Sequence, residues 1–251
     1  MPTAEIDGSL LNTFNPYLCL QNYPRSRKRR FGALKDGGYV VALPSIPTPW
    51  DLYISAGVGQ DESFSQDFIN YYALPKTQCW AFDGTITQFP RNYLPRPPRG
   101  IWWVKKNIGP HMTETTVNLG RLIAAHSNIF LKMDIEGAEY EWFLSLAAEQ
   151  LAHFREIVVE FHNINTEPSA PAVFALLQSS HNLVHVHANN YGGVDSTTGI
   201  PNVIEVVWIR KDDPAFLVTD DMPPPPPPLP ILIPIDYPND PDRPDIQEWA
   251  T

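Results

Sequence analysis

The sequence has little cysteine, fewer basic than acidic residues, and no long apolar run. Its two cysteines, Cys19 and Cys79, lie far apart, which argues against a disulfide framework or a cysteine metal site and fits a reducing compartment. The 18 Lys and Arg against 28 Asp and Glu leave a net charge of -10, so general binding to DNA or RNA gains nothing from counterion release. No apolar run approaches the roughly 18 residues of a membrane span.

The beginning of the chain also lacks the basic stretch and apolar segment of a secretory signal, so we expect a cytoplasmic protein. With 251 residues and 43% hydrophobic content, the chain is long enough for one well-packed domain. We expect an irregular lead-in over residues 1–30, the folded domain over residues 31–213, and a proline-rich tail over residues 214–251.

Short apolar segments alternate with helix-forming segments along the domain. This alternation predicts an α/β fold with a largely parallel, doubly wound sheet, whose strand ends meet at one edge. Helices are expected over residues 117–125, 138–148 and 170–178, and one begins near residue 62. Strands are expected near residues 52–55, 78–83, 100–105, 129–133, 156–162, 183–190 and 203–209.

The stretch around residues 129–140 organises the chain. A buried strand over residues 129–133 leads into Asp134 and Glu136, then into Gly137 and a helix. The two carboxylates are two residues apart, so in an extended backbone they share one face at the carboxyl end of a strand, where α/β sheets bind ligands. The alternative is that one of them only caps the helix.

A glycine turn follows the strand at residues 52–55. Gly57 and Gly59 allow the backbone to approach a ligand closely, and Asp61 is a candidate N-cap of the next helix, whose free N–H groups suit an anionic group. Asp83 ends the next strand, at the spacing of a carboxylate that accepts the hydroxyls of a ribose. A structural turn at the glycines and a helix cap at Asp83 are the alternatives.

Several further strand ends carry groups suited to proton transfer or metal binding. Candidate catalytic residues on this edge are Asp134, Glu160, His162 and His187, and Asn189 and Asn190 could orient substrate hydroxyls. The same Asp, Glu and His side chains could instead hold a divalent cation that lowers the pKa of a hydroxyl, or form ordinary hydrogen-bond networks. Lys132, inside an apolar strand, needs a carboxylate partner.

Two surface segments suggest partners. The basic cluster at residues 25–30 could meet a phosphorylated substrate, although a solvated surface run is the simpler interpretation. Residues 223–228 are six consecutive prolines, which predict polyproline II structure and a ligand for an SH3, WW or EVH1 type domain. The alternative is that this tail docks on its own domain or on a second copy.

The motif at residues 132–139 resembles the signature of the FkbM-type S-adenosylmethionine-dependent methyltransferases. Residues 55–59 resemble the cofactor loop of that family, and Asp83 its acidic residue after the second strand. Residues 36–40 and 185–190 are similar to segments of one branch of it. The resemblance implies a seven-stranded Rossmann-like sheet with helices on both faces. The sequence departs from the general methyltransferase loop at Ser55, where an acid is expected, and at Asp61, where a third glycine is expected.

We therefore expect an S-adenosylmethionine-dependent methyltransferase that methylates a hydroxyl of a small molecule or glycan. The resemblance implies cofactor contacts at Ser55, Gly57, Gly59, Asp61, Asp83 and Asp134, and we expect substrate contacts at Glu136, Asn189 and Asn190. One alternative is methylation of RNA or a nucleotide hydroxyl, supported only by the basic cluster. Another is a methyltransferase-like scaffold protein recruited through the polyproline tail.

Overall fold

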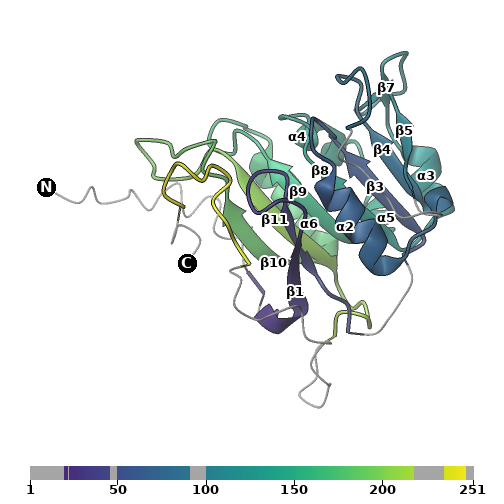
Figure 1. Cartoon of the computed structure of the whole chain (residues 1–251), viewed down its shortest axis with the longest axis horizontal. Helices are drawn as coiled ribbons and strands as arrows, with labels where there is room; N and C mark the ends of the chain where they lie inside the picture. Colours follow the sequence, from purple (N-terminus) through teal and green to yellow (C-terminus); the bar gives the residue numbers. More distant parts are fainter. Residues whose placement is uncertain (1–19, 22, 46–49, 91–99, 218–234, 247–251) are drawn as a thin grey trace, which may run out of the picture.

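A seven-stranded mixed sheet forms the centre of the molecule (Figure 1). The computed structural model describes residues 20–21, 23–45, 50–90, 100–217 and 235–246. In spatial order the strands are β10 (His181–Ala188), β11 (Ile204–Arg210), β9 (Phe154–Phe161), β8 (Ile129–Met133), β3 (Leu52–Ala56), β4 (Cys79–Phe82) and β5 (Trp102–Val104). β9, β8, β3, β4 and β5 run parallel, and β11 is antiparallel to both of its neighbours. The predicted α/β sheet is therefore present, with one reversed strand.

One face of the sheet is covered by four helices. These are α3 (Gly120–Ala125), α4 (Glu139–Leu144), α5 (Ala148–Leu151) and α6 (Ala170–Ser180). Alternate strand residues supply their contact surface, because successive side chains point to opposite faces of a sheet. Leu131 and Met133 of β8 belong to this core, with Trp142 and Phe143 of α4. The helix expected over residues 138–148 is thus two short helices, α4 and α5.

The opposite face is covered by one helix and a β-hairpin. Helix α2 (Ser63–Tyr72) packs Phe64 and Phe68 against Phe130 of β8, and the Phe68 and Phe130 rings lie 4.0 Å apart. The hairpin joins β1 (Lys28–Phe31) to β2 (Tyr39–Ala42) beside this helix. Its first strand begins inside the segment expected to be irregular, because Phe31 is buried against the aromatic side chains of α2.

Short elements complete the described chain. They are the 3-10 helices η1 (Arg25–Arg27) and η2 (Lys76–Gln78), and the paired strands β6 (Asn107–Ile108) and β7 (Thr116–Val117). β7 includes Val117, where the sequence predicted the start of a helix; that helix, α3, begins only at Gly120. No helix among the described residues is long and apolar enough to cross a membrane.

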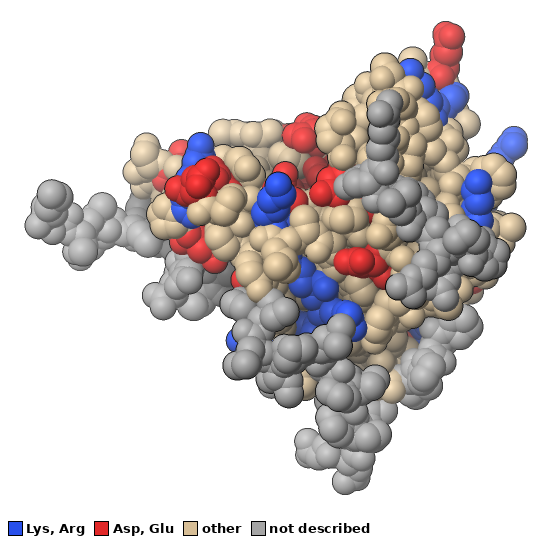
Figure 2. All heavy atoms as spheres, in the orientation of Figure 1, with Lys and Arg blue, Asp and Glu red and all other residues tan. Residues whose placement is uncertain are grey.

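The basic cluster is largely used in packing. Arg27 is buried, Arg29 lies over the rings of Phe31 and Tyr71, and Arg30 donates to the carbonyls of Ala33 and Lys35. Figure 2 shows a contiguous group of Lys and Arg side chains in the lower middle of this face, with acidic side chains beside it. Three of the arginines in the cluster therefore have packing or hydrogen-bonding roles, whereas Arg25 is exposed.

Residues 235–246, here called the C-terminal segment, pack against the β10 edge of the sheet (Figure 1). Asn239 is fully buried and donates to Glu205 Oε1 at 2.6 Å and to Asp36 Oδ1 at 3.3 Å. Ile246 forms a bridge with Ala188 at the end of β10. The six prolines at 223–228 lie outside the described residues, so the predicted polyproline structure and its partner domains stay predictions.

Candidate functional site

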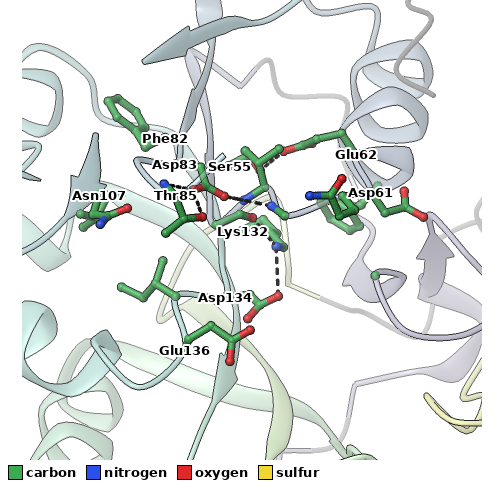
Figure 3. A pocket seen from close by; sticks show the side chains of 18 of the residues that line it. Ser55, Asp61, Glu62, Phe82, Asp83, Thr85, Asn107, Lys132, Asp134 and Glu136 are labelled. Atoms are coloured by element: carbon green, nitrogen blue, oxygen red, sulfur yellow. Dashed lines mark hydrogen bonds and ion pairs between the residues drawn. The ribbon is translucent and has the colours of Figure 1, made fainter. Parts of the chain in front are cut away.

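A cavity of about 500 Å³ lies at the carboxyl ends of β3, β4 and β8 (Figure 3). Its walls come from the loop after β3, the start of α2, the end of β4 and the turn after β8. This is the edge where ligands bind in open α/β sheets, and the volume lies within the range of small-molecule sites. Of the predicted site residues, six line it together: Ser55, Gly57, Gly59, Asp61, Asp83 and Asp134; Glu136 lines it as well.

The two loop glycines are required by different constraints. Gly57 has a φ of +77°, and a Cβ there would lie 1.6 Å from the carbonyl oxygen of Asp134, so no other residue fits between β3 and β8. Gly59 has a φ of +57°, but a Cβ there would meet no atom within 4 Å. Gly57 therefore joins two strands closely, whereas Gly59 borders open space in the cavity wall.

Asp83 holds the glycine loop in place. Its Oδ2 accepts hydrogen bonds from the N–H groups of Val58 (3.0 Å) and Gly59 (2.9 Å), and its Oδ1 accepts from Thr85 N and Oγ1. Burial alone would raise the pKa of Asp83, but these hydrogen bonds lower it below its ordinary value. The charged carboxylate is thus already well hydrogen-bonded, and ribose hydroxyls would replace some of these donors. Its ribose role stays a prediction.

Ser55 stands where the general methyltransferase loop has an acid, and the buried carboxyl group of Glu62 lies next to it. The Ser55 hydroxyl donates to Glu62 Oε1 at 2.8 Å, and Glu62, only 2% exposed, lines the cavity. Burial raises the pKa of Glu62 to about 7. Sequence reasoning missed this residue and took Asp61 as the helix cap. The N-cap residue of α2 is Glu62. Asp61, the residue before it, still accepts a hydrogen bond at its Oδ1 from the N–H group of Ser63, the first residue of the helix.

The end of β8 brings a lysine and an aspartate to the cavity. Lys132 donates to the carbonyl oxygen of Gly57 at 2.8 Å and lies 3.5 Å from Asp134 Oδ2, which is the expected carboxylate partner. The backbone then turns: Glu136 has a φ of +58°, so the expected extended geometry of Asp134 and Glu136 is wrong. Both side chains nevertheless face His162, because the turn brings Glu136 back towards it.

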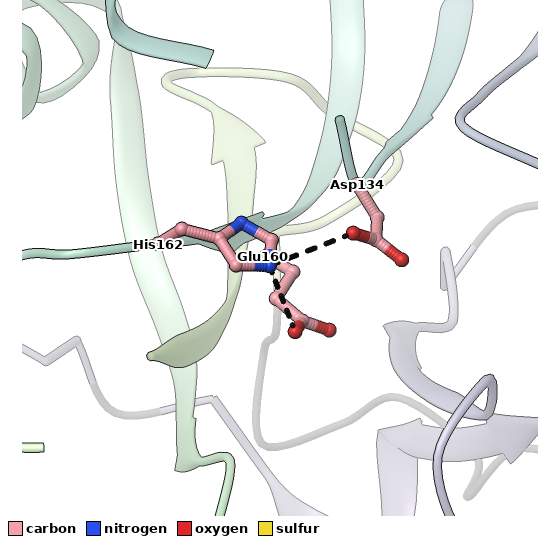
Figure 4. A group of neighbouring side chains, drawn as sticks. All are labelled: Asp134, Glu160 and His162. Carbon is pink, nitrogen blue, oxygen red and sulfur yellow. Dashed lines mark ion pairs between the residues drawn. The ribbon is translucent and has the colours of Figure 1, made fainter. Parts of the chain in front are cut away.

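Asp134, which lines the cavity, forms a compact group with Glu160 and His162 (Figure 4). His162 Nε2 lies 3.5 Å from Glu160 Oε1 and 3.9 Å from Asp134 Oδ1. Tyr39, from the hairpin, donates towards Asp134 Oδ2 at 3.0 Å and Glu160 Oε2 at 3.1 Å. The sequence offered Tyr39 only as part of a resembling motif, because no local spacing relates it to residues about a hundred positions away.

The electrostatics of this group are strongly acidic. Burial, and then the charges of Asp134, Glu205 and Asp36, raise the pKa of Glu160 well above its ordinary value. Burial would lower the pKa of His162, but its hydrogen bond to Glu139 and the surrounding carboxylates raise it. The group therefore favours a proton or another cation on His162.

The structure does not bring His187 into this group. It lies on β10, separated from β9 by β11, and its ring nitrogens face Glu205 Oε2 (3.4 Å) and Asp245 Oδ1 (3.3 Å). Neighbouring strands are about 4.8 Å apart, which puts His187 roughly 10 Å from Glu160. We therefore leave His187 out of the proposed catalytic and metal-binding set.

The two asparagines differ in their surroundings. Asn189 donates to Glu160 Oε1 at 2.9 Å, so it supports the acidic group. Asn190 is buried and pairs with the backbone of Asp240 in the C-terminal segment, donating to its carbonyl at 2.9 Å and accepting from its N–H at 2.7 Å. Neither lines the cavity. The geometry therefore gives Asn190 a structural contact where the sequence suggested a substrate contact.

The strand order, with one reversed strand, and the glycine-lined cavity at the carboxyl ends define a Rossmann-like fold of the methyltransferase type. The sequence profile described as the methyltransferase FkbM domain matches residues 29–188, and the chain belongs to this family. No curated protein matches the chain significantly. The match runs from β1 to the end of β10, which confirms the resemblance and identifies the chain as a methyltransferase by family.

Proposed function

We propose that this protein is an S-adenosylmethionine-dependent methyltransferase that methylates a hydroxyl group of a small molecule or glycan. The observation that supports this most is the cavity itself. The glycine loop, the buried Glu62 and Asp134, a group able to accept a proton, line it together. Cofactor and acceptor would thus meet at the carboxyl ends of β3 and β8.

The glycine loop, Glu62 and Asp83 fit the cofactor. The open space at Gly59 admits a ligand against the backbone, and the buried carboxyl of Glu62 suits the α-amino group of the methionine end. Asp83, at the end of β4, would hold the ribose. When bound, S-adenosylmethionine supplies an electrophilic methyl group on a positively charged sulfur.

On the acceptor side, Asp134 is the proposed general base. The acceptor oxygen forms its bond to the methyl carbon as the carbon–sulfur bond breaks, and the hydroxyl proton passes to the carboxylate of Asp134. Lys132 and Tyr39 hold Asp134 in position through its Oδ2. Much of the rate would come from holding the acceptor oxygen in line with the methyl group.

The alternatives gain no support from the described residues. Methylation of RNA rested on the basic cluster, whose Arg27 is buried and whose Arg29 and Arg30 pack against neighbouring groups. Recruitment through the polyproline tail rested on residues outside the described chain. A cytoplasmic location remains our expectation from the sequence.

The cofactor class is tested by calorimetry on the purified chain. We expect S-adenosylmethionine and S-adenosylhomocysteine to bind with one site per chain, and NAD not to bind at the same concentrations. Binding of NAD without either sulfur compound would overturn the proposal. Asp83→Asn should weaken both sulfur ligands, and circular dichroism of the variant separates that loss from unfolding of the protein.

A further inference from the structure

The group of Asp134, Glu160 and His162 has the spacing of metal ligands. One ligand atom from each residue lies within 4.8 Å of the others, and the two distances from His162 Nε2 are 3.5 and 3.9 Å. Ligands bound at about 2.1 Å are about 3.0 Å apart in an octahedral and about 3.4 Å apart in a tetrahedral site. Side-chain rotations that shorten the longer of these distances would therefore close the set on one ion.

The imidazole is oriented as it is in metal sites. Glu139, fully buried in α4, accepts hydrogen bonds from the N–H groups of Ile135 and Gly137, and its Oε1 lies 3.1 Å from His162 Nδ1. The proton of a neutral His162 is therefore on Nδ1, and the lone pair of Nε2 faces the carboxylates. A buried carboxylate that orients a histidine in this way is the usual outer partner of a metal ligand.

The two carboxylates are held from the side away from His162. Tyr39 contacts Asp134 Oδ2 and Glu160 Oε2, so Asp134 Oδ1 and Glu160 Oε1 are the oxygens nearer the imidazole; Glu160 Oε1 also accepts a hydrogen bond from Asn189 Nδ2 at 2.9 Å. Tyr39 has one hydroxyl hydrogen for two carboxylates, so it cannot satisfy both. Among the described residues, no hydrogen bond joins His162 Nε2 to the carboxylate oxygens around it.

The charge of the group is unbalanced. Four carboxylates surround the imidazole: Asp134, Glu136, Glu139 and Glu160. Lys132 lies beside one of them. One oxygen of the buried Glu139, Oε2, also has no hydrogen-bond partner among the described residues. Glu139 and Glu160 are buried, so their like charges are costly without a cation or a bound proton, and a divalent ion neutralises more of this charge than a proton on His162 does.

We propose that Asp134 Oδ1, Glu160 Oε1 and His162 Nε2 bind one divalent transition-metal ion of the Mn²⁺, Fe²⁺, Co²⁺ or Zn²⁺ type. A mixed set of imidazole nitrogen and carboxylate oxygen suits these ions, whereas Mg²⁺ and Ca²⁺ prefer oxygen alone. Glu136, with 85% of its side chain exposed and its Oε2 3.4 Å from His162 Nε2, is placed to add a fourth ligand.

The position of the ion gives it a role in the proposed reaction. Asp134 and Glu136 line the cavity, so an ion bound to them reaches an acceptor oxygen there. A metal-bound hydroxyl loses its proton more readily, which strengthens the nucleophile, and with Asp134 Oδ1 on the ion the proton would pass to Asp134 Oδ2. This role rests on the proposed function, but metal binding itself does not.

The test is titration of the full chain, freed of metal by chelation, with Mn²⁺ and with Zn²⁺ at pH 7.5. We expect one Mn²⁺ per chain by calorimetry and by loss of the free-ion electron paramagnetic resonance signal. His162→Gln and Glu160→Gln should each weaken Mn²⁺ binding at least tenfold. Glu139→Gln should weaken it less, because Glu139 orients the imidazole without touching the ion.

His187→Gln is the matched control. His187 is also buried between two carboxylates, Glu205 and Asp245, but lies outside the group, so this variant should bind Mn²⁺ as the wild type does. Equal losses of Mn²⁺ affinity in His162→Gln and His187→Gln, or no binding by the wild type, overturn the proposal.

If the His162 and Glu160 variants do not fold, anomalous diffraction from wild-type crystals grown with Mn²⁺ decides: an ion between the three residues supports the site, and its absence there overturns it. Calorimetry with S-adenosylhomocysteine reports on the cofactor separately, so the two proposals can fail independently.

Discussion

Two histidines at the same edge of the sheet have similar partners but different access. His162 faces Asp134, Glu136, Glu139 and Glu160 beside the cavity, and 13% of its side chain is exposed. His187 faces Glu205 and Asp245, and 5% of its side chain is exposed. The difference in exposure comes from the C-terminal segment, which supplies Asp245 and covers the end of β10. A histidine among carboxylates thus lies beside the cavity at one place and is covered by packing at the other.

The largest difference between the surroundings of His162 and those of His187 is expected in turnover, from the variant Asp134→Asn. Removing the proposed base should lower turnover by about 10²- to 10⁴-fold on any acceptor that the wild type methylates. The measurement is release of S-adenosylhomocysteine at saturating acceptor and cofactor.

Asp245→Asn is the control for this prediction, because Asp245 stands in the corresponding position beside His187. It should leave turnover unchanged, because Asp245 does not line the cavity. Full turnover by Asp134→Asn would contradict the proposed base, and equal losses in both variants would show that the comparison has no catalytic meaning.

The sequence predicted the sheet well because its strands are locally encoded. The strand expected at residues 129–133 is β8, and the edge where Asp134, Gly57 and Asp83 meet follows from parallel strands. The family motif then identified the class of enzyme before any contact was known.

What the sequence could not give are contacts between distant segments. Tyr39 reaches Glu160 across 121 residues, and Asn190 meets the C-terminal segment 50 residues later. No periodicity encodes such pairs, so His187 and Asn190 were equivalent to His162 and Asn189 on the sequence alone. Glu62 was missed for a related reason, since only the turn after β3 brings it back over Ser55.

A smaller effect is expected at the cofactor end of the cavity, from Glu62→Gln. If the carboxylate binds the α-amino group, the variant should bind S-adenosylhomocysteine about 10- to 100-fold more weakly, the value of a charge-assisted hydrogen bond of about 1.5–3 kcal/mol. Methylthioadenosine, which lacks the amino acid portion, should bind both proteins equally. An equal loss for both ligands would mean that Glu62 only supports the loop through Ser55.

The carboxyl group of Glu62 also predicts that cofactor affinity depends on pH. With the pKa of Glu62 at about 7 in the free protein, wild-type affinity for S-adenosylhomocysteine should fall about tenfold for each pH unit below 7, because the carboxyl must lose its proton to bind an ammonium group. The slope should vanish in Glu62→Gln. Calorimetry between pH 5.5 and 8 measures it.

The smallest effect is expected where the histidine is closed by packing. Burial would lower the pKa of His187, but its hydrogen bond to Glu205 and the charges of Asp236 and Asp245 raise it above the ordinary 6.5. Its stabilising contribution is therefore fully present below pH 6.5 and is lost as the pH rises through the raised pKa. His187→Gln should lower the free energy of unfolding by about 1–2 kcal/mol at pH 6, the cost of one buried hydrogen bond, and by less at pH 8. Urea unfolding measures both values, with the exposed His111→Gln as the control that changes neither.

Because Mn²⁺ would bind only at His162, adding it should stabilise the wild type and His187→Gln by equal amounts. A smaller increase in the free energy of unfolding in His187→Gln would show that His162 and His187 are coupled, and the two would then belong to one extended site.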